Sequence, residues 1–282
     1  MATVAVRQFS DRLVEAVARK RSQLVVGLDP VAGRLPPGLD GDVAEFCRGI
    51  VDAVAERAVA VKPQSAFFEV EGPEGVAAFH ATCAYAREAG LLVIADVKRG
   101  DIGSTAAAYA QAYLPLADAV TVNPYLGRDS LEPFVDACRR HGAGLFCLVK
   151  TSNPGSRDLQ DARLADGRLV WQRVAELVGS LGEGLLGDAG LSSVGAVVGA
   201  TFPAEIEEAR RLLPRAPFLL PGIGAQGAVP RDVAAAFAAG PAGALVSASR
   251  SVIYASSGAD WREAAAAEAA LLAAETWRVS GA

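Results

Sequence analysis

The chain has 282 residues, a hydrophobic fraction of 51% and a formal net charge of −5. This length suits one large α/β domain that needs no disulfide or metal staples, and the negative charge argues against nucleic acid or an anionic membrane as a partner. Its N-terminal segment lacks the apolar core of a secretory signal, and no apolar run is long enough to span a membrane.

The cysteines and histidines point to the compartment. None of the cysteines forms a CxxC pair, and two histidines are too few for a His-based metal site. Unpaired thiols are typical of a reducing cytosol, so we expect a soluble cytoplasmic protein without a metal site. The four cysteines are Cys47, Cys83, Cys138 and Cys147.

Short β-branched segments alternate with helical segments along the chain, and no change in composition marks a domain boundary. The predicted strands are residues 23–29, 58–63, 91–98, 118–124, 144–152, 194–201, 216–222 and 242–249. The predicted helices are residues 9–20, 43–57, 75–89, 105–113, 131–141, 170–186, 203–213, 231–239 and 261–277.

Eight strands that are apolar on both faces, each followed by a helix, predict a parallel sheet covered by helices. The number eight favours a closed (β/α)8 TIM barrel, formed by one domain over residues 1–282 with an extra helix at the N-terminus. An open dinucleotide-binding sheet is less consistent with the sequence, because no G-x-G-x-x-G follows the first strand.

Polar residues gather where the predicted strands end, and barrel enzymes build their sites at those ends. Asp29, Lys62 and Asn123 each precede a proline, which keeps the preceding residue extended. Asp96 and Lys98 lie two apart on one strand, so both should point to the same face. These charges could form a purely structural ion-pair network, but charges at a barrel mouth favour a functional site.

The ends of the last two strands predict a phosphate site. The segment "PGIGAQG" after the seventh strand offers glycines such as Gly222 for close backbone approach, and Gln226 as a donor. Arg250 follows the eighth strand, and its planar guanidinium suits a phosphate. We therefore expect a phosphorylated small molecule as the substrate, with its reactive end near Lys98.

A polar insertion follows the fifth strand over residues 152–169. An insertion of this length and composition is consistent with a lid over the site and equally with a surface loop. Its base, "KTSNPGS", is the better candidate for contact with a substrate.

At this point the motifs support a family. The segment "DVKRGDIGSTA" resembles the D-x-K-x-x-D signature of orotidine 5′-phosphate decarboxylases. Six further segments resemble the longer-chain bacterial branch of the same family: "GLDP", "VKPQSAFFE", "TVNPYLG", "LVKTSNPGS", "PGIGAQGA" and "SRSVIYAS". The resemblance covers residues 24–256, with the motifs in the family's order.

The resemblance implies that orotidine 5′-phosphate loses CO₂ to give uridine 5′-phosphate, the last step of de novo pyrimidine synthesis, without a metal or organic cofactor. Lys98 would deliver a proton to C6 of the pyrimidine, and Asp96 would lie by the departing carboxylate. The charged array implied by the resemblance comprises Lys62, Asp96, Lys98 and Asp101.

The resemblance also implies binding roles and a homodimer whose sites are shared across the interface. Asp101, Ile102 and Thr105 would serve the neighbouring subunit's site. The residues implied to bind substrate are Asp29 and Lys62 at the ribose hydroxyls, Ser152 and Asn123 on the base side, and Gly222, Gln226 and Arg250 at the phosphate.

Three alternatives remain open. A sugar-phosphate decarboxylase or epimerase of the same superfamily would need Mg²⁺, but the ammonium of Lys62 occupies the slot where those enzymes place a carboxylate. A Schiff-base aldolase using Lys62, Lys98 or Lys150 would need a lysine of lowered pKa. Two adjacent carboxylates should keep Lys98 charged, so Lys150, with no obvious carboxylate nearby in sequence, is the lysine to test. A non-catalytic nucleotide-binding barrel would share the fold without the activity.

Overall fold

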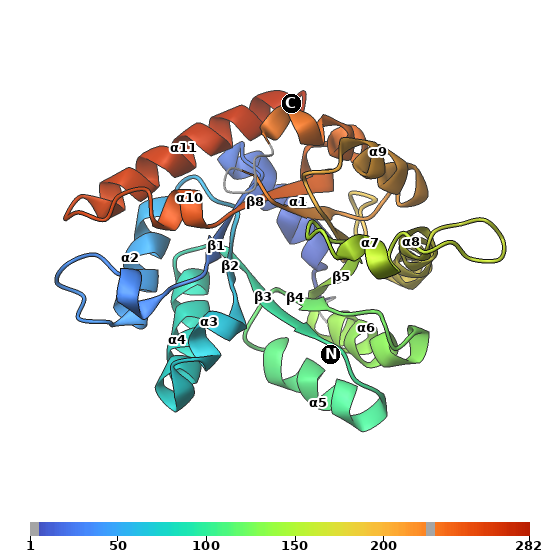
Figure 1. Ribbon diagram of the computed structural model, residues 1–282, viewed down its shortest axis with the longest axis horizontal. Helices are drawn as coiled ribbons and strands as arrows, with labels where there is room; N and C mark the ends of the chain where they lie inside the picture. Colours follow the sequence, from blue (N-terminus) through green and yellow to red (C-terminus); the bar gives the residue numbers. More distant parts are fainter. Residues whose placement is uncertain (1–5, 224–228) are drawn as a thin grey trace, which may run out of the picture.

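The computed structural model describes residues 6–223 and 229–282. Eight parallel strands pair in chain order, and β8 pairs with β1, so the sheet closes into a barrel (Figure 1). The predicted TIM barrel is thereby confirmed. The strands are β1 (Leu24–Leu28), β2 (Ala60–Pro63), β3 (Leu92–Arg99), β4 (Ala119–Val122), β5 (Gly144–Lys150), β6 (Val194–Val198), β7 (Phe218–Pro221) and β8 (Ala244–Ala248).

Helices form the outer layer of the molecule (Figure 1). The α-helices are α1 (Phe9–Lys20), α2 (Val43–Val54), α3 (Ser65–Glu69), α4 (Gly72–Glu88), α5 (Gly103–Tyr113), α6 (Arg128–His141), α7 (Ser156–Leu159), α8 (Val170–Gly182), α9 (Pro203–Leu212), α10 (Arg250–Ile253) and α11 (Trp261–Val279). In the described part of the chain, four segments are 3-10 helices: η1 (Ala32–Arg34), η2 (Glu183–Leu185), η3 (Pro230–Ala239) and η4 (Pro241–Gly243). The segment predicted as an α-helix over residues 231–239 is therefore wound as the tighter 3-10 form.

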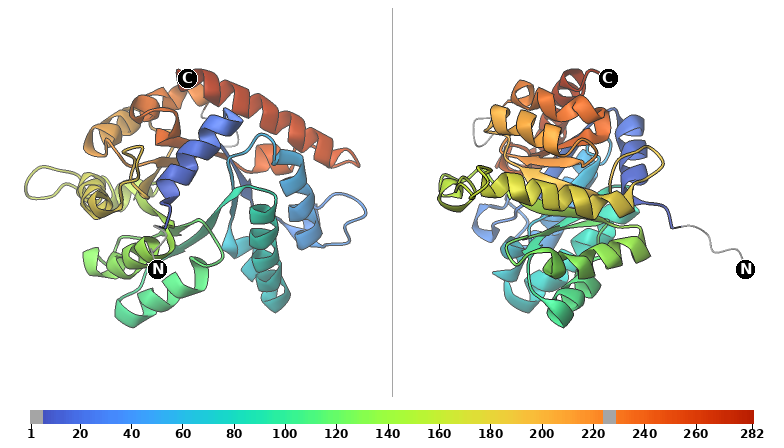
Figure 2. Two further views of the ribbon diagram at one scale, coloured as in Figure 1. Left: turned by 180° about the vertical axis from the view of Figure 1, so that it is seen from behind. Right: turned by 90° about the vertical axis from the view of Figure 1, so that its right-hand side faces the viewer.

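The structure has two apolar cores, and their positions leave the barrel accessible at the end where the strands finish. One core lies between the strands and the surrounding helices. The other fills the barrel itself, where α1 packs Phe9, Leu13 and Val17 against strand residues such as Phe146. Figure 2 shows α1 lying across the end of the barrel where the strands begin. Because α1 closes the end where the strands begin, polar groups can gather at the other end, where the strands finish.

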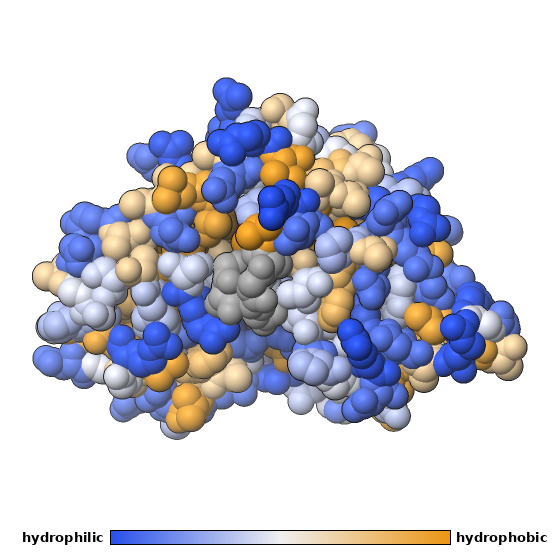
Figure 3. Space-filling view, turned by 45° about the horizontal axis from the view of Figure 1, so that its top comes forward, coloured by the Kyte–Doolittle hydropathy of each residue, from blue (hydrophilic) through white to orange (hydrophobic). Residues whose placement is uncertain are grey.

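On the face seen in Figure 3, the hydrophobic residues of the described part of the chain lie in small groups among hydrophilic ones. Within the described part of the chain, no helix combines the length and the apolar character that a bilayer span requires. All four cysteines are buried and unpaired. Burial raises the pKa of the Cys83 and Cys138 thiols to about 12, so they are poor nucleophiles.

Candidate active site

Two lysines and an aspartate meet at the ends of β2 and β3. The Nζ atom of Lys62 lies 2.5 Å from Oδ2 of Asp96, and the Nζ atom of Lys98 lies 2.6 Å from Oδ1. The side chains of Lys62 and Asp96 are 9% and 7% exposed, whereas that of Lys98 is 43% exposed. Lys98 is thus the most exposed member of these three.

Two residues that the sequence analysis did not single out complete the contacts of Asp96. Gln64 donates from Nε2 to Oδ2 at 3.2 Å, and Thr121 donates from Oγ1 to Oδ1 at 2.9 Å. With the two ammonium groups, the carboxylate accepts four hydrogen bonds, which matches its lone-pair capacity. The one available signal for Thr121 was its place as a polar residue inside an otherwise apolar strand.

The electrostatics keep the buried pair charged. Burial by itself would raise the pKa of Asp96, but the ammonium groups of Lys62 and Lys98 outweigh it and hold this pKa well below its ordinary range. Burial would likewise lower the pKa of Lys62, yet Asp96 and then Asp29 hold it above its ordinary value. Both groups are therefore ionised at neutral pH, in a place where an unpaired charge would be costly.

Lys98 does not sit in the regular strand that its spacing from Asp96 predicts. The register between β3 and β4 jumps from Ala95–Val120 to Arg99–Val122, and the φ of Lys98 is +44°. A lysine rarely adopts this left-handed conformation. The predicted meeting of Asp96 and Lys98 is confirmed, but a bulge rather than simple alternation produces it.

A cavity of about 150 Å³ adjoins the array at the ends of β1, β2, β7 and β8. Among its lining residues are Asp29, Lys62, Gly222 and Arg250, four of the predicted substrate-binding residues. Oδ1 of Asp29 is buried and has no hydrogen-bond partner among the described residues. It is therefore an acceptor that a hydroxyl group of a bound molecule could satisfy.

A second cavity, of about 400 Å³, shares Asp29 and Arg250 with the first. Here Tyr254 joins the two sides of the mouth, because its hydroxyl accepts the Val31 N–H at 2.8 Å and donates to the Asp29 carbonyl at 3.4 Å. The guanidinium of Arg34 stacks on the Tyr254 ring, with Cζ 4.2 Å from the ring centroid. The loop after β1 is thus tied to the helix that carries Arg250.

Ser152 lies at the ends of β5 and β6 and lines a separate hollow of about 720 Å³ with Asn153, Arg157 and Phe202. Gly199 makes room for it, since a Cβ at Gly199 would lie 3.0 Å from the Cβ of Ser152. Ser152 therefore lines a different hollow from Lys62 and Arg250.

Lys150 was expected to have no nearby carboxylate, which made it the lysine to test for a Schiff base, but the structure gives it one. Its ammonium pairs with Asp161, which lies in the insertion after β5, and its side chain is 1% exposed. Its Nζ also lies 5.4 Å from the centroid of the Phe202 ring. Lys150 therefore anchors the insertion to the barrel, and the carboxylate that was not evident in its sequence neighbourhood comes from eleven residues away.

The remaining predicted residues are not gathered into the array. Asp101 accepts the N–H of Ile102 at 2.8 Å, while Ile102 and Thr105 are exposed at the start of α5. Asn123 is also exposed, and its side-chain oxygen accepts the Tyr125 N–H at 3.1 Å in a local turn. Gln226 lies outside the described residues.

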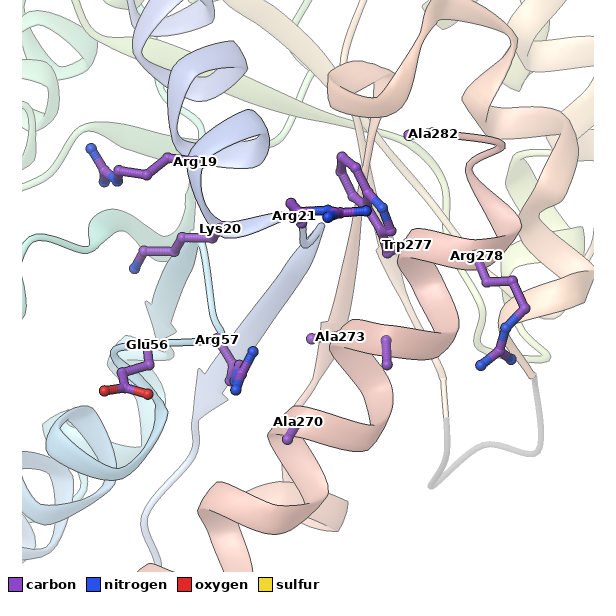
Figure 4. Close-up of a pocket in the computed structure, with 11 residues that line it drawn as sticks. Arg19, Lys20, Arg21, Glu56, Arg57, Ala270, Ala273, Trp277, Arg278 and Ala282 are labelled. Carbon is purple, nitrogen blue, oxygen red and sulfur yellow. The ribbon is translucent and has the colours of Figure 1, made fainter.

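Another cavity, of about 940 Å³, lies away from these strand ends. Figure 4 shows its lining side chains, which come from the end of α1, the turn before β2, and α11. Lys20 donates there to the carbonyls of Ala55 and Ala58, and burial together with Arg19 lowers its pKa to about 8. Cations at helix C-termini complement the helix dipole, which accounts for this basic lining.

Comparisons of the sequence and the fold with known proteins identify the family of this chain. A sequence model described as "Orotidine 5'-phosphate decarboxylase / HUMPS family" matches residues 22–267. The chain belongs to this family. A curated orotidine 5′-phosphate decarboxylase from Rhodopirellula baltica is 48% identical over 268 residues, which cover 88% of each chain.

Solved structures of the family agree in fold. A crystal structure of a Streptomyces avermitilis protein superposes with a TM-score of 0.87 at 40% identity and covers 100% of this chain and 99% of its own. The orotidine monophosphate decarboxylase of Leishmania donovani gives a TM-score of 0.79 at 36% identity, with 98% and 100% coverage. The family resemblance drawn from the strand-end motifs is thereby confirmed.

Proposed function

We propose that this protein decarboxylates orotidine 5′-phosphate to uridine 5′-phosphate, the final step of pyrimidine nucleotide synthesis. The observation that carries the proposal is the contact chain Lys62–Asp96–Lys98 beside a cavity lined by Asp29 and Arg250. The curated relatives named for this reaction support it.

In the proposed reaction the bond between C6 and the carboxylate carbon breaks, CO₂ leaves, and the electron pair stays on C6. The Lys98 ammonium lies where this charge develops, stabilises it, and then transfers a proton from Nζ to C6. Lys98 recovers its proton from solvent, and its 43% exposed side chain leaves a path for that step. Asp96, held by four donors, would face the substrate carboxylate and keep Lys98 aimed at C6.

Binding energy would come from groups remote from C6. Arg250 and the backbone at Gly222 would hold the phosphate, as is common after the last strands of a barrel. Gln226 is proposed as a further phosphate donor. Asp29 and Lys62 would hold the ribose hydroxyls, and the unpartnered Oδ1 of Asp29 is suited to accept one of them. Such contacts can raise the rate when their energy is realised in the transition state.

We further propose that the enzyme is a homodimer and that Asp101, Ile102 and Thr105 complete the partner's site. Ile102 is 58% exposed, and the apolar side chains of Tyr125 and Leu126 after β4 are 75% and 46% exposed. A second copy of the chain would cover these apolar groups and bring Asp101 to an array. Asn123 and Ser152 remain proposed contacts on the base side.

Residues 1–282 are proposed to act as one catalytic domain in the cytoplasm. The four free, buried cysteines support a reducing compartment. The proposed reaction uses no metal or organic cofactor.

The Mg²⁺-dependent sugar-phosphate reaction is the second candidate, because the description of the matching family also names a HUMPS branch beside the decarboxylases. The ammonium of Lys62, 2.5 Å from Asp96, would repel a divalent cation at that carboxylate. In residues 6–223 and 229–282, no three His, Cys, Asp or Glu side chains gather as a metal-binding group.

The test is to mix EDTA-treated protein with orotidine 5′-phosphate and follow loss of the orotate absorbance, with the Lys98→Ala variant beside it. Turnover in the wild type that is lost in Lys98→Ala is the expected result. If only Mg²⁺ with a sugar phosphate gives turnover, the second candidate replaces the first. If the protein binds uridine 5′-phosphate and converts nothing, it is a binding module.

A further inference from the structure

The strand that carries the proposed proton donor leaves its ladder at the donor itself. Ala95 pairs with Val120 and Arg99 pairs with Val122, so the residues between Ala95 and Arg99 face a single residue of β4, Thr121. Lys98 in this bulge has a φ of +44°, a left-handed conformation that is strained for a residue other than glycine. Such a conformation persists only where the surroundings hold it.

The side chain of Thr121 supplies that hold. Its Oγ1 accepts the backbone N–H of Lys98 at 2.9 Å, which replaces the ladder bond lost at the bulge. The same oxygen donates to Oδ1 of Asp96 at 2.9 Å, the carboxylate oxygen that also accepts from Nζ of Lys98. Thr121 is 1% exposed, so water does not compete for these bonds.

A hydroxyl group has one hydrogen and two lone pairs. Because the Lys98 N–H points at a lone pair of Thr121, the hydroxyl hydrogen is left to point at Asp96. One side chain therefore fixes both ends of the lysine: its backbone directly, and its ammonium through the carboxylate. The branched Cβ of threonine restricts rotation about χ1, which makes the hydroxyl direction stiffer than a serine would.

We propose that Thr121 is a positioning residue for the decarboxylation, which it serves by holding Lys98 in its strained conformation and aiming its ammonium through Asp96. This inference rests on the proposed function of the array. Thr121 acts through Lys98 and Asp96 and is not itself required to touch the substrate.

The decisive variant is Thr121→Val, which keeps the shape and removes both hydrogen bonds. We expect kcat to fall about 100-fold, the scale of a misplacement of about 1 Å at a reacting group. KM should stay within about threefold, because the proposed phosphate and ribose contacts lie on other strands. Thr121→Ser restores the hydroxyl and should recover kcat to within about tenfold of wild type.

Thr276→Val is the matched control, since Thr276 is fully buried and its hydroxyl bonds backbone carbonyls within α11. It should leave kcat and KM unchanged within about twofold. If Thr121→Val keeps wild-type kcat, or if Thr121→Ser is no better than Thr121→Val, the proposal is overturned. Should Thr121→Val fail to fold, Thr121→Cys, with its weak donor, takes its place with the same two criteria.

A second readout does not depend on turnover. Hydrogen exchange of the Lys98 amide should be at least about tenfold faster in Thr121→Val than in wild type, and close to wild type in Thr121→Ser. An amide that stays protected in Thr121→Val contradicts the inference. If the wild-type protein fails to decarboxylate, the proposed function falls, and amide exchange alone then decides whether Thr121 holds the lysine.

Discussion

At the end of the barrel where the strands finish, two regions differ in how far one chain satisfies and buries their polar groups. At the ends of β2 and β3, Asp96 is 7% exposed in its side chain and has all its hydrogen-bonding capacity filled by the same chain. At the start of α5, Asp101 has a local bond to the next N–H, and Ile102 is 58% exposed. The first region is assembled by folding, whereas the second is presented at the surface.

This difference separates stability from function. Groups that one chain satisfies and buries must affect the free energy of unfolding when they are removed. Groups at the surface of one chain that are proposed to complete a neighbour's site should affect activity or dimerisation rather than the stability of the single chain.

A variant of either region should lose most of its turnover, but dimers that combine one variant of each kind should recover activity. Lys98→Ala should lower kcat by about 10⁴-fold and Asp101→Ala by about 10³-fold. When the two variants are co-expressed in equal amounts, half of the dimers are mixed and each holds one intact site, so about a quarter of wild-type activity should return. Mixing the variants after separate purification without subunit exchange is the control. No recovery would mean that Asp101 serves its own chain's site.

Stability should respond to one region and not to the other. Asp96→Ala leaves Lys62 buried without its partner and should reduce the free energy of unfolding by about 3–5 kcal/mol. Asp101→Ala should change it by less than about 0.5 kcal/mol, because the bond that its side chain makes within the described chain is to the neighbouring Ile102 N–H. Urea unfolding of both variants measures this, and equal losses would contradict the contrast.

Ile102→Asp tests whether a second copy of the chain covers the start of α5. A charge in the centre of an apolar contact should weaken dimerisation by roughly 30-fold or more. Leu271→Asp is the matched control, because Leu271 is 63% exposed on α11. Light scattering across a dilution series measures the dissociation. Equal behaviour of the two variants would place the interface elsewhere.

The smallest expected effect is the pH dependence of stability. Folding lowers the pKa of Asp96, so its stabilisation is present above the pKa of about 3.9 of an unfolded aspartate and is lost as pH falls through the folded value. Folding raises the pKa of Lys62, so its stabilisation is present below about pH 10.4 and is lost above the folded value.

The measurement is the difference in free energy of unfolding between wild type and Asp96→Asn from pH 6 to pH 2. It should be constant near pH 6 and should shrink as the solution becomes more acidic than about pH 4. A difference that is constant down to pH 2 would show that Asp96 is not paired in the folded protein.

Much of this arrangement could be predicted from the sequence, because barrel strands have a simple signature. Apolar runs ending in Asp29, Lys62 and Asp96 predicted both the strands and the meeting of Lys62, Asp96 and Lys98, since all strand ends face one side of a parallel barrel. The family motifs then supplied roles for individual residues.

What could not be predicted depends on contacts between segments distant in sequence. The Lys150–Asp161 pair was not expected, because the insertion folds back on its own strand. Thr121 was not singled out, because its importance comes from a register jump in the neighbouring strand. A bulge of this kind has no signal in the alternation of residues along a single strand.

The most direct test of the account is to run the reaction of EDTA-treated wild-type protein with orotidine 5′-phosphate in D₂O and analyse the product by NMR and mass spectrometry. We expect uridine 5′-phosphate with one deuterium at C6 and one CO₂ for each substrate consumed, since the Lys98 ammonium exchanges its protons with solvent before it donates one. Recovery of unchanged substrate, or turnover that appears only after a divalent metal is added, would contradict it.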